Sequence, residues 1–109
     1  MAYDRALDAR ILNMTKGWEG LSRRGMFGGL GYSLNGNLAF GIWGDALVVR
    51  CGPERYQDCL AEPGVCAFAA TGRRMTGWVS VDQEKLDSEQ ELARWLELGR
   101  SFAASLPAK

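Results

Sequence analysis

The chain has 109 residues, of which 47% are apolar, and its 13 basic residues balance 13 acidic ones. This length predicts one domain over residues 1–109 with a single modest core, and the apolar content excludes a disordered segment. A net charge of zero does not favour direct nucleic-acid binding, because proteins that bind nucleic acids usually carry an excess of basic charge.

The sequence contains no histidine, which excludes Ser-His-Asp and Cys-His catalytic arrangements and every metal site with a histidine ligand. The cysteines, Cys51, Cys59 and Cys66, are odd in number and form no Cys-x-x-Cys pair, so neither a disulfide framework nor a zinc site is predicted. We expect three buried, reduced thiols. An enzyme that uses Cys51 or Cys66 as its nucleophile is the less favoured alternative.

No apolar run approaches the roughly 18 residues that a membrane-spanning helix needs. The N-terminus also lacks the charged and then apolar layout of a signal peptide. These patterns predict a cytoplasmic protein without membrane contact. No cofactor motif and no metal-ligand spacing is evident either, so we expect no cofactor and no metal.

The first predicted element is a helix over residues 3–16, whose apolar residues recur at helical spacing: Tyr3, Leu7, Ile11 and Met14. Gly17 then provides a cap. A glycine-rich stretch over residues 23–37 follows and opens three predicted strands.

The register of these strands follows from their turns. A three-residue loop over Asn35-Gly36-Asn37, with Asn37 left-handed, places apolar residues opposite one another on one face: Leu34 and Leu38, Tyr32 and Phe40, Leu30 and Ile42. A tight Gly44-Asp45 turn sets Ile42 opposite Leu47 and extends the same face. Because both turns agree, we expect this face to form the core.

The opposite face of the sheet carries a strip of glycines. The same register sets Gly31 opposite Gly41, and Gly29 opposite Trp43. The favoured interpretation is that Trp43 covers this exposed backbone. The alternative is a shallow groove that a peptide, a ligand or a second subunit could approach closely.

The second half of the chain predicts a short helix over residues 52–61, strands over 65–70 and 77–82 joined by a turn at 71–74, and a last helix. Ser88 and Glu91 form a capping box at the start of that helix. Its inward stripe is Leu92, Trp95, Gly99, Phe102 and Leu106. The predicted fold is α+β, an antiparallel five-stranded sheet with flanking N-terminal, middle and C-terminal helices.

Three further patterns concern binding. The glycines do not match Gly-x-Gly-x-x-Gly and lead into a hairpin, which argues against a phosphate site. Acidic residues near the last helix suit its dipole and form no evident catalytic pair. The pairs Arg23-Arg24 and Arg73-Arg74 either protect strand ends from edge pairing, which we favour, or form a patch for an acidic partner or a nucleic-acid backbone.

The stretch Arg24-Gly25-Met26-Phe27-Gly28-Gly29-Leu30, followed by Leu34-Asn35-Gly36-Asn37, resembles the signature of the TfoX N-terminal domain family. Members typically show Arg-Met-Phe-Gly-Gly, then a strand and an Asn-Gly or Asp-Gly turn; here Gly25 displaces the arginine by one position. Further matches follow in order: Leu47-Val48-Val49-Arg50, Thr71-Gly72-Arg73, Met75-x-Gly77-Trp78-Val79-x-Val81-Asp82 and Phe102-Ala103-Ala104-Ser105-Leu106-Pro107. The resemblance covers nearly the whole chain.

The resemblance implies a compact α+β domain. The family has no established catalytic residues that could be assigned to positions of this sequence. The family's namesakes are regulators of natural competence that assist transcription of DNA-uptake genes, and they carry a second, C-terminal domain. We expect this chain to be a stand-alone first domain, because no such segment follows Lys109.

These observations together predict a non-enzymatic regulatory or protein-interaction module, whose partner is a protein and, as one candidate, the transcription machinery. The expected contact surface comprises Arg23, Arg24, Gly29, Gly31, Gly41, Trp43, Arg73 and Arg74. The alternative function is a homodimeric domain that binds a small ligand or a peptide.

Overall fold

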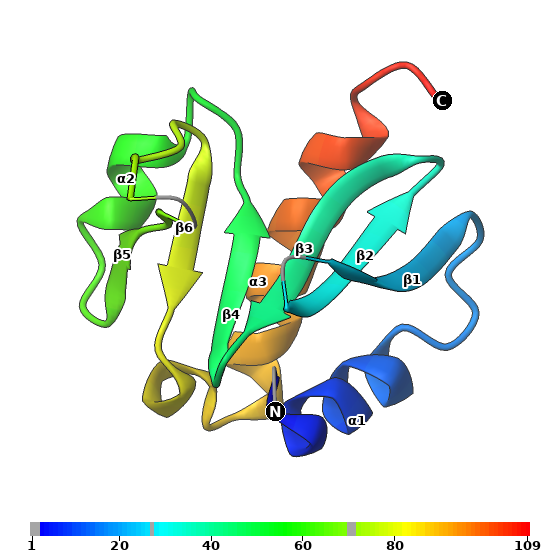
Figure 1. Ribbon diagram of the computed structural model, residues 1–109, viewed down its shortest axis with the longest axis horizontal. Coiled ribbons are helices and arrows are strands. Elements are labelled where there is room, and N and C mark those ends of the chain that lie inside the picture. Colours follow the sequence, from blue (N-terminus) through cyan, green and yellow to red (C-terminus); the bar gives the residue numbers. More distant parts are fainter. Residues whose placement is uncertain (1–2, 27, 70–71) are drawn as a thin grey trace.

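The computed structural model describes residues 3–26, 28–69 and 72–109. Within these ranges an antiparallel sheet of six strands, in the order β1-β2-β3-β4-β6-β5, forms the centre of the fold (Figure 1). The strands are β1 (Leu21–Met26), β2 (Gly29–Leu34), β3 (Asn37–Trp43), β4 (Ala46–Arg50), β5 (Val65–Ala67) and β6 (Trp78–Val81). Three positions of the sequence predictions, Phe27 of the family signature, Ala70 at a strand end and Thr71 in a turn, lie outside the described residues.

The α+β class and the antiparallel sheet are confirmed, but the predicted number of five strands is wrong. The additional strand is β1, which pairs with β2 along its whole length. Its sequence, Leu-Ser-Arg-Arg-Gly-Met, lacks the apolar alternation of a half-buried strand. Because β1 lies at the edge of the sheet and its central residues are exposed, it needs little apolar character.

The helices are α1 (Arg5–Met14), α2 (Tyr56–Leu60), the short 3₁₀ helix η1 (Gln83–Leu86) and α3 (Glu89–Ala104). Side chains cap the two longer ones: the Asp4 carboxylate accepts from the N–H of Leu7, and the Ser88 hydroxyl accepts from the N–H of Glu91, each at 3.0 Å. None of these helices combines the length and the apolar character that crossing a membrane requires.

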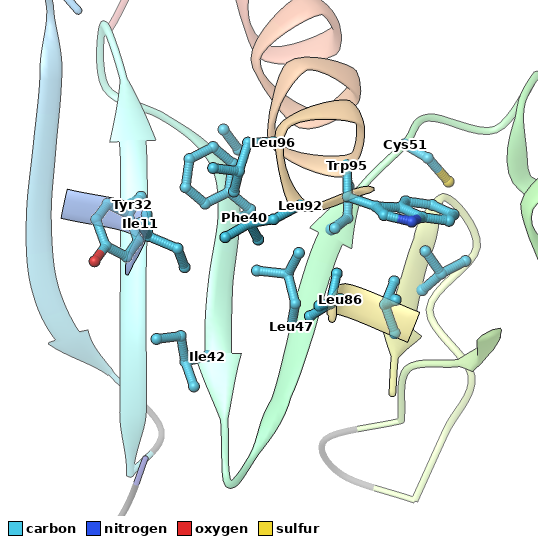
Figure 2. Close-up of a cluster of buried hydrophobic side chains, with 14 of the residues drawn as sticks. Ile11, Tyr32, Phe40, Ile42, Leu47, Cys51, Leu86, Leu92, Trp95 and Leu96 are labelled. Carbon is cyan, nitrogen blue, oxygen red and sulfur yellow. The ribbon is translucent and has the colours of Figure 1, made fainter. Parts of the chain in front are cut away.

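The core lies on one face of the sheet, between the strands and the helices α1 and α3. Figure 2 shows Leu92, Trp95 and Leu96 of α3 packed toward Phe40 and Leu47 of the sheet. Trp95 and Phe40 are fully buried, as are Leu7 and Ile11 of α1. In Figure 1 α3 lies behind β3 and β4, so the opposite face of these strands is turned to the viewer.

The β2–β3 hairpin confirms the predicted pairs Leu30–Ile42, Gly31–Gly41 and Tyr32–Phe40. Its tip differs from the prediction, because Asn35 and Gly36 form a two-residue turn with φ of 52° and 86°. Such a turn favours Asn-Gly, which tolerates positive φ at both positions. Asn37, expected in the left-handed position, instead pairs with Leu34 as the first residue of β3.

A β-bulge reconciles this short turn with a buried apolar face. The register shifts between Tyr32 and Ser33, so Ser33 pairs with Leu38 and Ala39 is the extra residue in β3. Ala39 and Phe40 are both fully buried. Leu38, which the sequence placed in the core, is therefore only half-buried and belongs to the other face of the sheet.

The second tight turn is confirmed. Trp43 pairs with Ala46 across Gly44 and Asp45, and Ile42 faces Leu47 as predicted. Val79 and Val81 of β6 are fully buried and extend the core face from β4 across to the next strand.

Candidate interaction groove

The outer face of the sheet, opposite α3, contains an open groove with a volume of about 370 Å³. Its floor comes from adjacent strands, because Gly31 of β2 pairs with Gly41 of β3, and Gly41 pairs with Val48 of β4. Residues with longer side chains surround this floor, and they are Leu38, Trp43, Phe68, Arg73, Arg74, Met75 and Trp78. We call this feature the outer groove.

Glycine is required in the floor by the close approach of neighbouring backbone. A Cβ atom on Gly41 would lie 2.4 Å from the carbonyl oxygen of Leu30, which is closer than real Cβ contacts. Gly29 faces the same restriction, with 2.3 Å to the carbonyl oxygen of Ile42. Gly29 is buried but does not line the outer groove, whereas Gly31 and Gly41 do.

Trp43 forms part of the wall of the outer groove and leaves the groove open. Its side chain is 38% exposed, and its ring meets that of Phe68 edge-on, with centroids 5.5 Å apart and an interplanar angle of 73°. Phe68 follows β5, so this contact joins the β3–β4 hairpin to the segment that leads toward β6. The wall is completed by Met75, which is 37% exposed, and by half-buried Trp78.

The structure separates the predicted arginines. Arg73 and Arg74 are exposed and line the outer groove. Arg24 is exposed and pairs with Gly31, which places it in the same cross-strand row as the floor, although it does not line the groove. Arg23 alternates to the core side, where its guanidinium donates to the Asp8 carboxylate at 2.6 and 3.1 Å.

The model of the TfoX N-terminal domain matches residues 13–103, a range that includes every residue of the outer groove. The chain belongs to the TfoX N-terminal domain family. Neither the curated proteins nor the solved structures contain a match to it.

The ion pair between Arg23 and Asp8 joins β1, the edge strand of this TfoX N-terminal domain, to α1. Burial opposes ionisation of Asp8, yet hydrogen bonds from Arg23 and Tyr32 hold the pKa of its carboxyl below the usual value. Burial and the neighbouring Asp8 raise the pKa of the Tyr32 hydroxyl, which donates to the Asp8 carboxylate. Arg23 is thereby committed to a structural contact, unlike Arg73 and Arg74.

The cysteines differ from the prediction in one respect: Cys51 and Cys59 are buried, but Cys66 is exposed. Burial raises the pKa of the Cys51 thiol to about 12, so this group is protonated at neutral pH. Its Sγ donates weakly to the carbonyl oxygen of Gly77 at 3.4 Å. Cys51 is thus a poor candidate for a nucleophile. Within the described ranges no cluster of three or more acidic or cysteine side chains could hold a metal ion.

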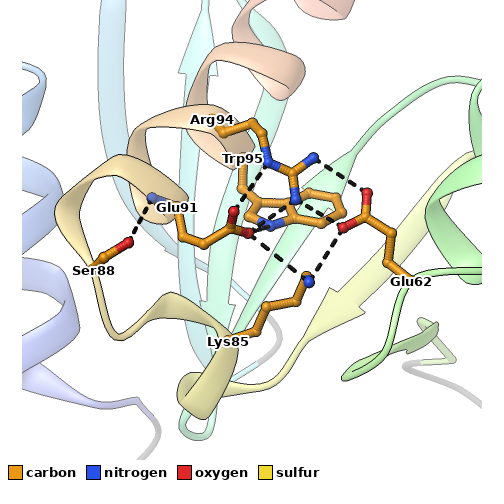
Figure 3. Close-up of polar contacts among 6 residues, drawn as sticks. All are labelled: Glu62, Lys85, Ser88, Glu91, Arg94 and Trp95. Carbon is orange, nitrogen blue, oxygen red and sulfur yellow. Dashed lines mark hydrogen bonds and ion pairs between the residues drawn. The ribbon is translucent and has the colours of Figure 1, made fainter.

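A charged network lies away from the outer groove, at the start of α3 (Figure 3). Arg94 contacts Glu62 at 2.7 Å and Glu91 at 2.9 Å, and Lys85 contacts Glu62 at 3.2 Å. The Glu91 carboxylate also accepts from the indole N–H of Trp95 at 3.1 Å. Glu91 therefore supports the packing of α3, beyond the dipole role that its position predicted, and does not complete the expected capping box with its side chain.

Five of the residues predicted for the contact surface line the outer groove, and they are Gly31, Gly41, Trp43, Arg73 and Arg74. The prediction did not include the other wall residues, Leu38, Phe68, Met75 and Trp78, or Val48 of the floor. Leu38 was missed because the bulge at Ala39 is invisible to a strict alternation pattern. Phe68 was expected within a strand over 65–70 but follows β5, which ends at Ala67, and Met75 precedes β6, so alternation along a strand places neither side chain. Val48 could have been found, since strict alternation from Leu47 and Val49 already places it opposite the core.

Proposed function

We propose that this TfoX N-terminal domain is a non-enzymatic regulatory module that acts through protein contacts made by the outer groove, in the regulation of DNA-uptake genes. The observation that carries the proposal is an apolar groove, open to solvent, on a sheet face opposite the helix-covered core. Family membership supports the process, because the namesakes of the family regulate competence.

The residue types of the outer groove support a protein contact. Aromatic residues, methionine and arginine are enriched at protein interfaces, and Trp43, Met75 and Arg74 combine all three kinds around one apolar floor. Exposed apolar surface of this kind is costly to leave uncovered and often marks an interaction site. A regulatory rather than a catalytic role is supported by the protonated Cys51 thiol and the absence of histidine from the sequence.

A genetic test compares two exposed apolar residues. In a strain lacking the native gene, the domain is supplied as wild type, as Trp43→Ala or as Leu12→Ala, and transcripts of the DNA-uptake genes are measured. Leu12 is 42% exposed on α1, close to the 38% of Trp43, but lies outside the outer groove. The proposal expects a loss of transcripts for Trp43→Ala alone. Equal transcripts from all three forms, at equal protein levels, would count against it.

A second candidate function is the binding of a small ligand by a homodimer. The volume of the outer groove, about 370 Å³, favours it, since it falls within the range of small-molecule sites. Light scattering and thermal unfolding in the presence of a metabolite library test this candidate. It requires a dimer and a ligand-dependent rise in melting temperature that Trp43→Ala removes; a monomer whose melting temperature no compound changes would exclude it.

A further inference from the structure

We propose that the outer groove binds an acidic amphipathic helix of a partner protein, with the apolar side of the helix in the groove and its carboxylates against Arg73 and Arg74. This inference rests on the proposed function and specifies its partner. It follows from three features of the described residues: the position of the floor within the sheet, the chemistry of the walls, and the charge at the rim.

The floor of the outer groove cannot pair with an extended peptide. It belongs to β2, β3 and β4, which are interior strands, so their N–H and C=O groups already bond to neighbouring strands. A segment that lies on this floor must satisfy its own backbone hydrogen bonds, and a helix does so internally. The sheet already accepts a helix in this way on its other face, where α3 packs against β3 and β4.

The walls suit apolar side chains better than nucleic-acid bases. Leu38 and Met75 of the walls, like Val48 of the floor, have flexible or branched apolar side chains, which offer shape-filling contact and no flat stacking surface. The Trp43 and Phe68 rings meet at 73°, so they pack against each other edge-on and do not form a continuous platform. An amphipathic helix presents apolar residues at i, i+3, i+4 and i+7, and these would enter such a groove as a row of anchors.

The charge at the rim points to an acidic partner. Among the described residues that line the outer groove, two are arginines and none is acidic. None of the ion pairs formed within the described ranges uses Arg73 or Arg74, and both side chains are exposed. A second copy of this chain would bring a rim of the same sign, which disfavours self-pairing through this face.

A binding assay with designed peptides tests the charge and the groove together. The probe is a fluorescently labelled helical peptide with leucines on one face and glutamates beside them, and its counterpart carries lysine at every glutamate position. The variant Arg73→Glu/Arg74→Glu is compared with Arg5→Glu/Lys16→Glu, which changes the net charge equally at exposed residues near the two ends of α1. Fluorescence anisotropy gives the affinities.

The wild-type domain and the α1 control should prefer the glutamate peptide. Arg73→Glu/Arg74→Glu should bind it about tenfold more weakly or worse, because two attractive rim contacts become repulsive, and should gain affinity for the lysine peptide. Met75→Ala should weaken the binding of both the glutamate peptide and the lysine peptide, because it removes part of the apolar wall. No preference between the peptides, or an equal effect of the two charge reversals, would overturn the proposal. So would tighter binding of a single-stranded oligothymidylate than of the glutamate peptide, or a groove-dependent dimer in sedimentation.

The outcomes separate this inference from the function on which it rests. If Trp43→Ala abolishes DNA-uptake transcripts while neither peptide binds the groove, the groove has a partner of other chemistry and the helix inference fails alone. If the glutamate peptide binds with the expected charge dependence while Trp43→Ala leaves transcription unchanged, the helix site stands and the competence function fails. Near-ultraviolet circular dichroism of each variant establishes that it is folded.

Discussion

The hydroxyl of Tyr32 donates a hydrogen bond to the buried carboxylate of Asp8, and this contact joins β2 to α1 beneath the edge of the sheet. Arg23 of β1 donates to both oxygens of the same carboxylate, at 2.6 and 3.1 Å. Asp8 therefore holds together three elements that come from different parts of the fold. Its side chain is 9% exposed, whereas that of Arg23 is 39% exposed.

Replacing Asp8 by alanine should destabilise the domain by about 2 kcal/mol, because it leaves the Tyr32 hydroxyl buried without an acceptor and removes the partner of Arg23. Urea unfolding of Asp8→Ala measures this loss. Glu54→Ala is the control, since Glu54 is exposed and enters no ion pair within the described ranges. Equal stability of the two variants would contradict a structural role for Asp8.

The domain should lose stability in acid. The pKa values of Asp8, Glu62 and Glu91 lie below their usual values, so at low pH the unfolded chain binds more protons than the folded one. Stability is therefore complete above the ordinary carboxyl pKa values and falls as pH drops below about 5 and passes through the lowered values. Urea unfolding over this pH range measures the slope. Asp8→Ala should reduce it, and an unchanged slope would argue against Asp8 as a source.

Gly41→Ala should destabilise the sheet by about 1–3 kcal/mol, because the added Cβ would force Leu30 and its carbonyl oxygen to move. Gly25→Ala is the matched control in β1, since its nearest neighbour, the carbonyl oxygen of Gly29, lies at an ordinary 3.7 Å. Chemical denaturation should show a near-neutral effect there. A Gly41→Ala variant as stable as Gly25→Ala would mean that the floor of the outer groove tolerates side chains.

One thiol of the three should react readily in the folded protein. Cys66 is exposed, whereas Cys51 and Cys59 are buried and their pKa values are raised. A thiol reagent followed by mass spectrometry of peptides should label Cys66 first and the other two only on unfolding. The variant Cys66→Ser should remove the fast phase. Rapid labelling of Cys51 in the native state would contradict its burial and support the alternative that it acts as a nucleophile.

Periodicity predicted most of the fold because the core obeys it. Leu30 and Tyr32 of β2 lie on the core face with Phe40 of β3, and Trp95 lies on the inner face of α3. Their positions follow from the burial of apolar residues, which is the pattern that periodicity detects. The edge strand β1 escaped prediction because two arginines and a glycine occupy its centre. There the strand is specified by pairing with β2 and by the Asp8 contact of Arg23, and neither is visible in local sequence.

The outer groove could be predicted only in part, for a related reason. Gly31, Gly41 and Trp43 follow from the register of two hairpins. The remaining wall depends on the bulge that turns Leu38 outward and on the segment that brings Phe68 against Trp43. Both are tertiary choices that alternation does not encode. The separation of Arg23 from Arg73 and Arg74 likewise depends on the face of β1 that carries Arg23 and on the connection between β5 and β6 that carries the other two.

The most direct test of the outer groove as a regulatory contact surface is the level of DNA-uptake transcripts in cells that carry Met75→Glu, compared with cells that carry Leu12→Glu. Both residues are partly exposed, at 37% and 42%, so both variants should fold. A carboxylate at Met75 would repel an acidic partner and disrupt the apolar wall. The proposed function predicts that transcripts fall for Met75→Glu and stay at the wild-type level for Leu12→Glu. Wild-type transcripts from a folded Met75→Glu protein would contradict it.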